Sequence, residues 1–183
     1  MERLKGYSEK LGVCALKVSL DEGKAIHGQV IKNAIDPDMH LSVSLINFYA
    51  KCHVFNFARQ VLDEMPERDV VSWTALISGL VADGYGNDCI YLFSEMRNEG
   101  IRPNEFSLAT CLRGGSICLD LEFGKQVHAE VIKLGFFLDI YVGSALVDLY
   151  AKCGDMEHAH KVFFCMPKQN DVRGMRCLMD MLR

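Results

Sequence analysis

The chain has 183 residues, of which 50% are hydrophobic and 24% charged, with four prolines and a formal net charge of −4. This composition is typical of a globular protein with its own core, and it argues against a disordered chain and against a need for a structural metal or cofactor. No apolar run approaches the roughly 20 residues of a membrane-spanning helix, and the acidic balance argues against strong nonspecific binding to nucleic acid.

Targeting signals and disulfides are not expected either. The first twenty residues mix acidic and basic side chains, a pattern that fits neither a secretory signal nor a transit peptide, so we expect any targeting signal to lie outside this chain. The eight cysteines are spread through amphipathic segments without a C-x-x-C pair. We expect reduced thiols that pack as small core residues.

A shift of 101 residues aligns the sequence with itself. GKAIHGQVIK at 23–32 returns as GKQVHAEVIK at 124–133, and FYAKC at 48–52 returns as LYAKC at 149–153. Between 20–66 and 121–167, 17 of 47 positions are identical, whereas average residue usage gives about three by chance. The chain is therefore an array of internal repeats.

Each repeat closes with Asp or Asn before an apolar run. These residues divide 1–171 into repeats at 4–38, 39–69, 70–104, 105–139 and 140–171. Each repeat has the pattern of two helices joined by a turn. A lone hairpin of this size cannot bury both of its faces, so we expect each hairpin to stack on its neighbours. We predict an all-α, right-handed superhelical solenoid of about five helix–turn–helix repeats, with the first helices lining one concave surface.

The repeats 70–104 and 140–171 show the hairpin pattern most clearly. In 70–104, Trp73, Leu76, Ile77 and Leu80 have helical spacing, and the second helix ends at Gly100, where a left-handed cap is expected before a proline. In 140–171, Gly154 supplies the turn between the helices. The second helix of this repeat is predicted to place Met156, Ala159, Val162, Phe163 and Met166 on one apolar face.

These residues resemble a known family. The blocks VVSWTALISGLVADG with LFSEMRNEGIRPN (70–104), YVGSALVDLYAKCGDMEHAHKVF (141–163) and DEMPERD (63–69) are similar to pentatricopeptide repeat proteins of the plant class with alternating long, short and standard repeats. The resemblance covers about 4–172. Segment 172–183 departs from it, and we interpret this departure as a sign of a fragment, of an aberrant terminus or of a truncated gene product.

The resemblance implies a function that composition and spacing do not show. Proteins of this family bind single-stranded organellar RNA, with one nucleotide per repeat, in the mitochondrion or the chloroplast. It further implies RNA processing, above all the choice of sites for cytidine-to-uridine editing, with editing-complex proteins as candidate partners. No catalytic residue and no small-molecule substrate are expected, so any chemistry falls to a partner or a further domain.

The resemblance also assigns candidate base-reading residues, which are the fifth and last residues of each repeat. The pairs are Ser8 with Asp38, Val43 with Asp69, Thr74 with Asn104, Ala109 with Asp139, and Ser144 with Asp171. Val43 and Ala109 have no hydrogen-bonding group, and Thr74 with Asn104 is the most informative pair. The alternative role for the closing Asp and Asn residues is capping of the helix that follows.

The second residue of each repeat is a candidate for stacking on the bases. These residues are His40, Val71, Phe106 and Tyr141. The alternative is that they pack between hairpins, which for Val71 is equally plausible.

Metal and nucleotide chemistry are not supported by the sequence. His128-Ala129-Glu130 matches the first half of a zinc deaminase signature, but no C-x-x-C follows. The set His158, His160, Cys153 and Cys165 has spacings that do not bring four ligands to one point. Gly124-Lys125 lacks the spacer and preceding glycine of a phosphate loop.

Two rivals remain open at this point. One is a protein-binding scaffold like the tetratricopeptide repeats, which share the hairpin geometry, although the alternating lengths favour an RNA binder. The other is a truncated, nonfunctional relative, since five repeats contact only about five bases.

Overall fold

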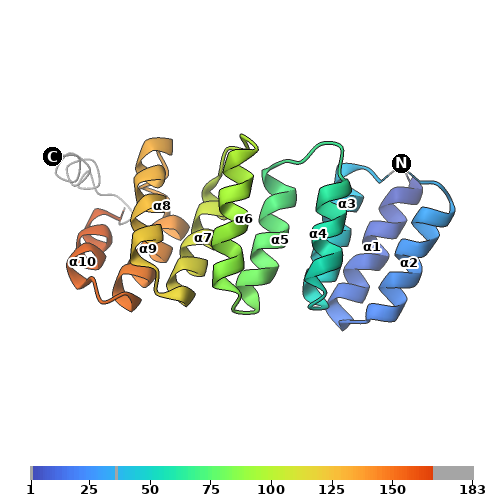
Figure 1. Cartoon of the computed structure of the whole chain (residues 1–183), viewed down its shortest axis with the longest axis horizontal. Helices are drawn as coiled ribbons and strands as arrows, with labels where there is room; N and C mark the ends of the chain where they lie inside the picture. Colours follow the sequence, from blue (N-terminus) through green and yellow to red (C-terminus); the bar gives the residue numbers. More distant parts are fainter. Residues whose placement is uncertain (1, 36, 167–183) are drawn as a thin grey trace. The chain divides into compact units, whose positions relative to one another are not determined.

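The computed structural model describes residues 2–35 and 37–166, and ten α-helices occupy this part of the chain (Figure 1). The helices are α1 (Glu2–Lys17), α2 (Leu20–Lys32), α3 (Met39–Lys51), α4 (Phe55–Glu64), α5 (Val70–Ala82), α6 (Gly86–Asn98), α7 (Glu105–Cys118), α8 (Leu121–Leu134), α9 (Ile140–Lys152) and α10 (Met156–Cys165). No strand occurs among the described residues. The predicted segment 172–183 lies outside them.

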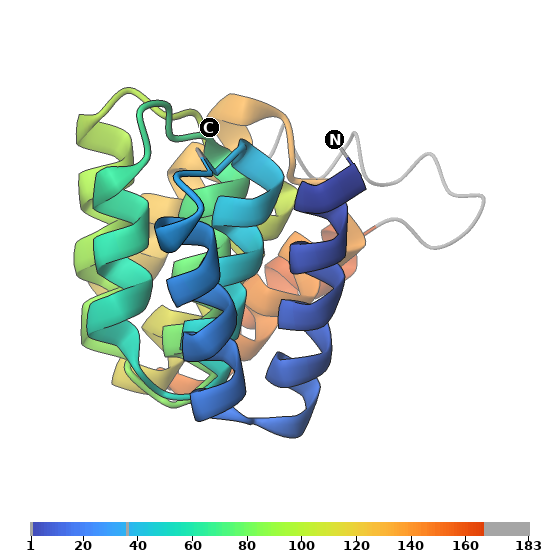
Figure 2. The same cartoon turned by 90° about the vertical axis from the view of Figure 1, so that its right-hand side faces the viewer.

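The chain forms two compact units, Met1–Asp83 and Gly84–Arg183. In the first unit α1 packs on α2 and α3, and α3 packs on α4 and α5. Figure 2 shows α1 and α2 side by side and antiparallel, joined by a short turn. In the second unit α7 packs on α6, α8 and α9, and α10 packs on α9. The division between the units falls inside the predicted repeat 70–104, between its two helices.

Local sequence signals account for the ends of the helices. The second helix of the repeat 70–104 ends before Gly100, whose φ of +78° is the left-handed conformation that glycine adopts without strain. The amide of Ile101 then donates to the carbonyl of Met96, which satisfies one of the last carbonyls of the helix. Gly154 has a φ of +80° in the turn before α10. Both predicted glycine turns are therefore present.

The core of the first unit lies between the first helices of its repeats and the second helices that cover them. Leu45, Phe48, Leu62 and Trp73 are 1% exposed or less. Gly23 on α2 allows a close approach, because a Cβ at this position would lie 2.0 Å from the ring of Phe48. Because Gly23 has no side chain, the ring of Phe48 can pack directly against the backbone of α2.

The core of the second unit is built in the same way. Phe93, Leu108, Val131 and Leu149 are completely buried. Gly124 repeats the role of Gly23, since a Cβ there would lie 2.3 Å from the side chain of Leu149. In both units, therefore, a glycine on a second helix makes room for a buried side chain on the first helix that follows it, on α2 and α3 in one unit and on α8 and α9 in the other.

The cysteines pack as predicted. Cys14, Cys52, Cys89, Cys111 and Cys165 are buried, Cys118 and Cys153 are half-buried, and the described cysteines form no disulfide. Burial raises the pKa of the Cys111 thiol well above its ordinary value, so this thiol stays protonated and unreactive. Cys177 lies outside the described residues.

The prediction of one apolar face on α10 was partly wrong. Ala159 and Val162 are buried, but Met156 and Phe163 are each 54% exposed. The reason is that α9 is the described helix against which α10 packs, so only one side of α10 is covered.

In the part of the chain that the structure describes, no helix has the length and apolarity to cross a membrane.

Candidate nucleic-acid interface

Within each unit the first helices of successive repeats lie against one another. Helix α1 contacts α3 and α3 contacts α5 in the unit Met1–Asp83, and α7 contacts α9 in the unit Gly84–Arg183. Each of these helices begins at the residue after the last residue of the preceding repeat, except α1. The candidate residues at the second and fifth positions therefore lie in the first two turns of neighbouring helices, next to the helix N-termini.

The candidate stacking residues are open to solvent. Tyr141 is 71% exposed, Phe106 59% and Val71 51%, and His40 is also exposed. Large apolar side chains at these positions gain free energy when a flat partner covers them. The structure thus leaves these faces uncovered by neighbouring hairpins, and base stacking on them stays a prediction.

The last residues of the first four repeats cap the helices that follow. Oδ1 of Asp38 accepts a hydrogen bond from the amide of Leu41 at 2.8 Å, and Oδ1 of Asp139 accepts one from the amide of Val142 at 2.9 Å. These contacts satisfy amides that have no partner inside the helix. The capping role is therefore present at both positions, whatever further role the carboxylates have.

Two of the caps are reciprocal. Oδ1 of Asp69 accepts from the amide of Ser72 at 2.9 Å, and the Ser72 hydroxyl accepts from the amide of Asp69 at 3.1 Å. Asn104 and Ser107 make the same pair of bonds, both at 2.9 Å. Because Asp and Asn both complete this capping box, either residue can hold the helix start at these positions. In Asn104 the cap uses Oδ1, which leaves the Nδ2 amide for a second contact.

The candidate fifth residues differ in their surroundings. Ser144 is exposed, Val43, Thr74 and Ala109 are half-buried, and Ser8 is only 7% exposed. The Thr74 hydroxyl donates to the carbonyl of Val70 at 2.5 Å, so its oxygen remains an acceptor for a further partner. Ser8 does not reach the surface of its unit.

The pairs are placed as follows. Ser8 and Asp38, and Val43 and Asp69, belong to the unit Met1–Asp83, while Ala109 and Asp139 belong to the unit Gly84–Arg183. Thr74 lies in the first of these units and Asn104 in the second. Ser144 lies on α9, and its partner Asp171 lies outside the described residues. Base reading by these pairs stays a prediction.

Sequence reasoning missed a histidine–tyrosine hydrogen bond that occurs once within each unit. Nδ1 of His27 on α2 lies 2.7 Å from the hydroxyl of Tyr49 on α3, and Nδ1 of His128 on α8 lies 2.8 Å from the hydroxyl of Tyr150 on α9. Both bonds join the second helix of one predicted repeat to the first helix of the next. The signal was visible in the 101-residue repeat, which preserves histidine and tyrosine, but their contact depends on how the helices pack.

Burial shapes the titration of these groups. Burial, with a smaller effect of His158, lowers the pKa of His128 to about 4, and burial raises the pKa of Tyr150 to about 12. Burial also lowers the pKa of His27. Both His128 and Tyr150 are therefore neutral at pH 7, and one hydrogen atom serves their bond.

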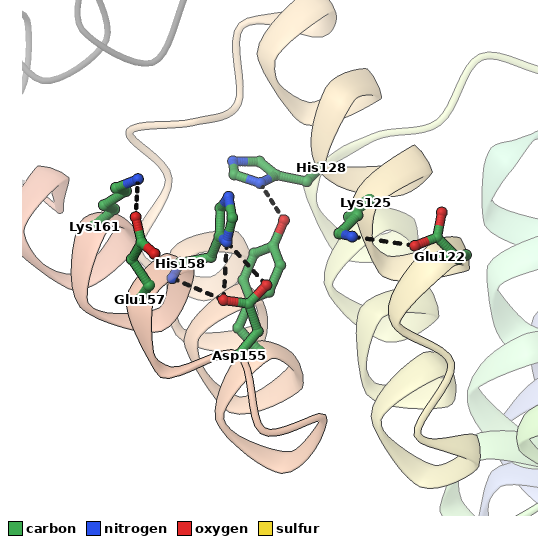
Figure 3. A network of polar contacts seen from close by, with 8 residues as sticks. Glu122, Lys125, His128, Asp155, Glu157, His158 and Lys161 are labelled. Carbon is green, nitrogen blue, oxygen red and sulfur yellow. Dashed lines mark hydrogen bonds and ion pairs between the residues drawn. The ribbon is translucent and has the colours of Figure 1, made fainter.

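The deaminase and zinc candidates have other surroundings. His128 contacts Tyr150 as described, and His158 is bonded through Nδ1 to both oxygens of Asp155 at 2.9 Å (Figure 3). Among the described residues, no group of three or more His, Cys, Asp or Glu side chains is arranged to hold a metal ion.

Family models match much of the chain. One described as the PPR repeat family matches residues 68–115, and one described as the PPR repeat matches 43–70 and 144–170, so that together they cover more than half of the chain. The chain belongs to the pentatricopeptide repeat family. The predicted family is therefore confirmed.

Two relatives from Arabidopsis thaliana illustrate how far the similarity extends. A pentatricopeptide repeat-containing protein named as mitochondrial is 40% identical over 167 residues, which are 91% of this chain and 27% of the relative. Another, named as chloroplastic, is 36% identical over 173 residues, or 94% of this chain and 28% of the relative. The chain spans about a quarter of the length of these relatives.

Two solved structures show the same fold. The pentatricopeptide repeat protein PPR10 from maize matches with a TM-score of 0.70 at 19% identity, over 97% of this chain and 25% of that one. The pentatricopeptide repeat domain of Arabidopsis thaliana protein-only RNase P 1, solved in complex with tRNA, matches with a TM-score of 0.63 at 15% identity, over 96% and 88%. The predicted all-α helical-repeat fold is thus confirmed.

Proposed function

We propose that this chain binds single-stranded RNA in a sequence-specific manner, with one nucleotide per repeat, as the recognition module of an organellar RNA-processing protein. The observation that carries the proposal is that Phe106 and Tyr141 are exposed at the starts of α7 and α9, two first helices that lie against each other, and that Val71 is exposed at the same position of α5. Unpaired bases offer flat faces to such side chains, whereas a duplex keeps its bases stacked on one another.

The polar groups beside these residues supply the reading of base edges. The Nδ2 amide of Asn104 donates and Thr74 offers a hydroxyl, a combination that the family resemblance associates with adenine. An Asp at the same position offers only acceptors, which suits the N–H group of uracil. The capping contact of Asn104 with Ser107 and the hydrogen bond of Thr74 to the carbonyl of Val70 hold these side chains in one orientation, and a fixed orientation is what discrimination between bases needs.

The place of action and the process follow from the family. The relatives named as mitochondrial and chloroplastic support an organellar location, and the alternating repeat lengths support the plant class with long, short and standard repeats. Within that class we propose the choice of sites for cytidine-to-uridine editing, with the chemistry supplied by editing-complex proteins or by another domain.

The test exchanges the base preference of one repeat. Segment 70–104 is placed in a longer pentatricopeptide repeat array, and the affinity is measured for RNAs that differ at one nucleotide. Thr74→Asn with Asn104→Asp should move the preference from adenine to uracil, with a discrimination of about 1–3 kcal/mol on the scale of a good base contact.

The structure provides the control for folding. Asp69 makes the same capping box as Asn104, so Asn104→Asp keeps the start of α7 intact. A loss of base preference in the double variant therefore reports on recognition and not on a lost cap. An unchanged preference, with the helical content preserved, would show that Asn104 serves only as a cap.

A further inference from the structure

A pocket of about 730 Å³ lies among α8, α9 and α10 of the second unit, and we call it the α8–α10 pocket. The residues that matter here are Lys125, His128, Tyr150, His158, Lys161 and Phe164. It is separate from the candidate nucleic-acid interface, because Tyr150 and Tyr141 are nine residues apart on α9, about 14 Å along a helix axis. Its volume suits an organic ligand far better than a single inorganic ion.

The floor of the pocket is a fixed polar network (Figure 3). His128 is 7% exposed, and its Nδ1 is taken up by Tyr150, so Nε2 is the nitrogen left for a ligand in the pocket. The ring of His158 stacks on Tyr150 at 5.3 Å between centroids, while its Nδ1 is held by Asp155. The imidazoles are thus oriented before any ligand arrives, which lowers the cost of binding.

The rim carries two ammonium groups. Lys125 pairs with Glu122 at 3.1 Å and Lys161 pairs with Glu157 at 2.7 Å, and all four side chains are close to half exposed or more. Exposed ion pairs of this kind contribute little net stability, because water and salt screen them and both side chains lose freedom when they pair. A doubly charged phosphate can therefore replace the carboxylates at little cost. Phe164, 65% exposed, adds an uncovered aromatic ring to the wall.

The first unit provides an internal comparison. At the positions 101 residues earlier, Lys24, His27 and Tyr49 are preserved, but Phe57 stands in the place of His158 and Gln60 in the place of Lys161. The His–Tyr bond is made in both units, so this bond belongs to the fold. His158, Lys161 and Phe164 are the features that set the α8–α10 pocket apart.

We propose that the α8–α10 pocket binds a nucleoside 5′-monophosphate, either free or as the 5′ end of an RNA. The phosphate lies between Lys125, Lys161 and the Nε2 of His128, and the base lies against Phe164 and His158. Stacking of the base on these aromatic rings adds binding free energy to that of the phosphate contacts. The nucleotide is a ligand here and undergoes no reaction.

The experiment is a calorimetric titration of the full chain with 5′-AMP, adenosine and inorganic phosphate. 5′-AMP should bind at one site, at least tenfold more tightly than either half alone. Phe164→Leu, which removes an aromatic ring from the proposed base contact, and Lys161→Gln should each weaken it at least tenfold. Lys161→Gln installs the residue that the first unit already has at the matching position, Gln60, and Phe164 is 65% exposed, so both variants should fold. Circular dichroism checks that the helices persist. Lys24→Gln is the matched control and should leave binding unchanged.

Further arms decide the source of the ligand and exclude other sites. A 5′-phosphorylated dinucleotide that binds as tightly as 5′-AMP points to an RNA end, and a much weaker one points to a free nucleotide. The proposal is overturned if 5′-AMP does not saturate a site, if phosphate alone binds as tightly, or if Phe164→Leu and Lys161→Gln have no effect. It is also overturned if Tyr141→Ala abolishes the binding, which would place the nucleotide on the first helices.

Discussion

Lowering the pH from 7 to 4.5 should destabilise the second unit through His128. The pKa of this histidine falls from an ordinary 6.5 to about 4 in the folded chain, mainly because the ring is buried. The unfolded chain therefore takes up a proton first as the pH falls, and the folded state loses stability between pH 6.5 and pH 4. Above pH 6.5 the neutral ring costs nothing in either state.

The size of the effect follows from the shift. Each pKa unit corresponds to about 1.4 kcal/mol, so full protonation of His128 lowers the free energy of unfolding by about 3 kcal/mol. Most of this decrease has occurred by pH 4.5. The comparison variant is His128→Gln, because glutamine does not titrate and its side-chain amide can form a hydrogen bond with the Tyr150 hydroxyl as either donor or acceptor. Subtraction of the variant from the wild type removes the contributions of all other titrating groups.

The assay is urea unfolding followed by far-ultraviolet circular dichroism at pH 7 and pH 4.5. The free energy of unfolding should fall by about 2–3 kcal/mol more in the wild type than in His128→Gln. Trp73, the only tryptophan, lies in the first unit, so its fluorescence shows whether the substitution has disturbed that unit. An equal fall in the two proteins would refute the assignment of a neutral, buried His128.

Two further predictions concern packing and RNA binding. Gly23→Ala should cost about 1–3 kcal/mol by overpacking against the buried ring of Phe48. Gly28→Ala on the same helix meets nothing within 4 Å and should stabilise the chain by up to about 1 kcal/mol; the same sign for both in urea unfolding would contradict this. Tyr141→Ala should weaken single-stranded RNA binding by about 1–3 kcal/mol. Tyr91→Ala, which removes a 62% exposed tyrosine from a second helix, should not, and an equal loss in a filter-binding titration would place the RNA elsewhere.

The sequence by itself determined the repeat, the helices and their ends. These depend on interactions within a few residues. Examples are the hydrogen bond that the Ser107 amide donates to Oδ1 of Asn104 and the left-handed turn at Gly100. Such signals are complete in a short window, so the helical hairpins could be predicted, most clearly in 70–104 and 140–171, and with them the family. The capping role of the closing Asp and Asn residues was predicted as an alternative for the same reason.

Only the tertiary structure decided which candidates are accessible and which residues meet. Ser8 and Ser144 hold the same position in their repeats, yet one is buried and the other exposed. His128 and Tyr150 are preserved by the repeat, but their bond requires α8 and α9 to pack at one particular register. Burial and contact between helices depend on the whole surface of each neighbouring helix, which no local pattern of residues encodes. The α8–α10 pocket is formed by residues of three helices, so it too could be found only in the tertiary structure.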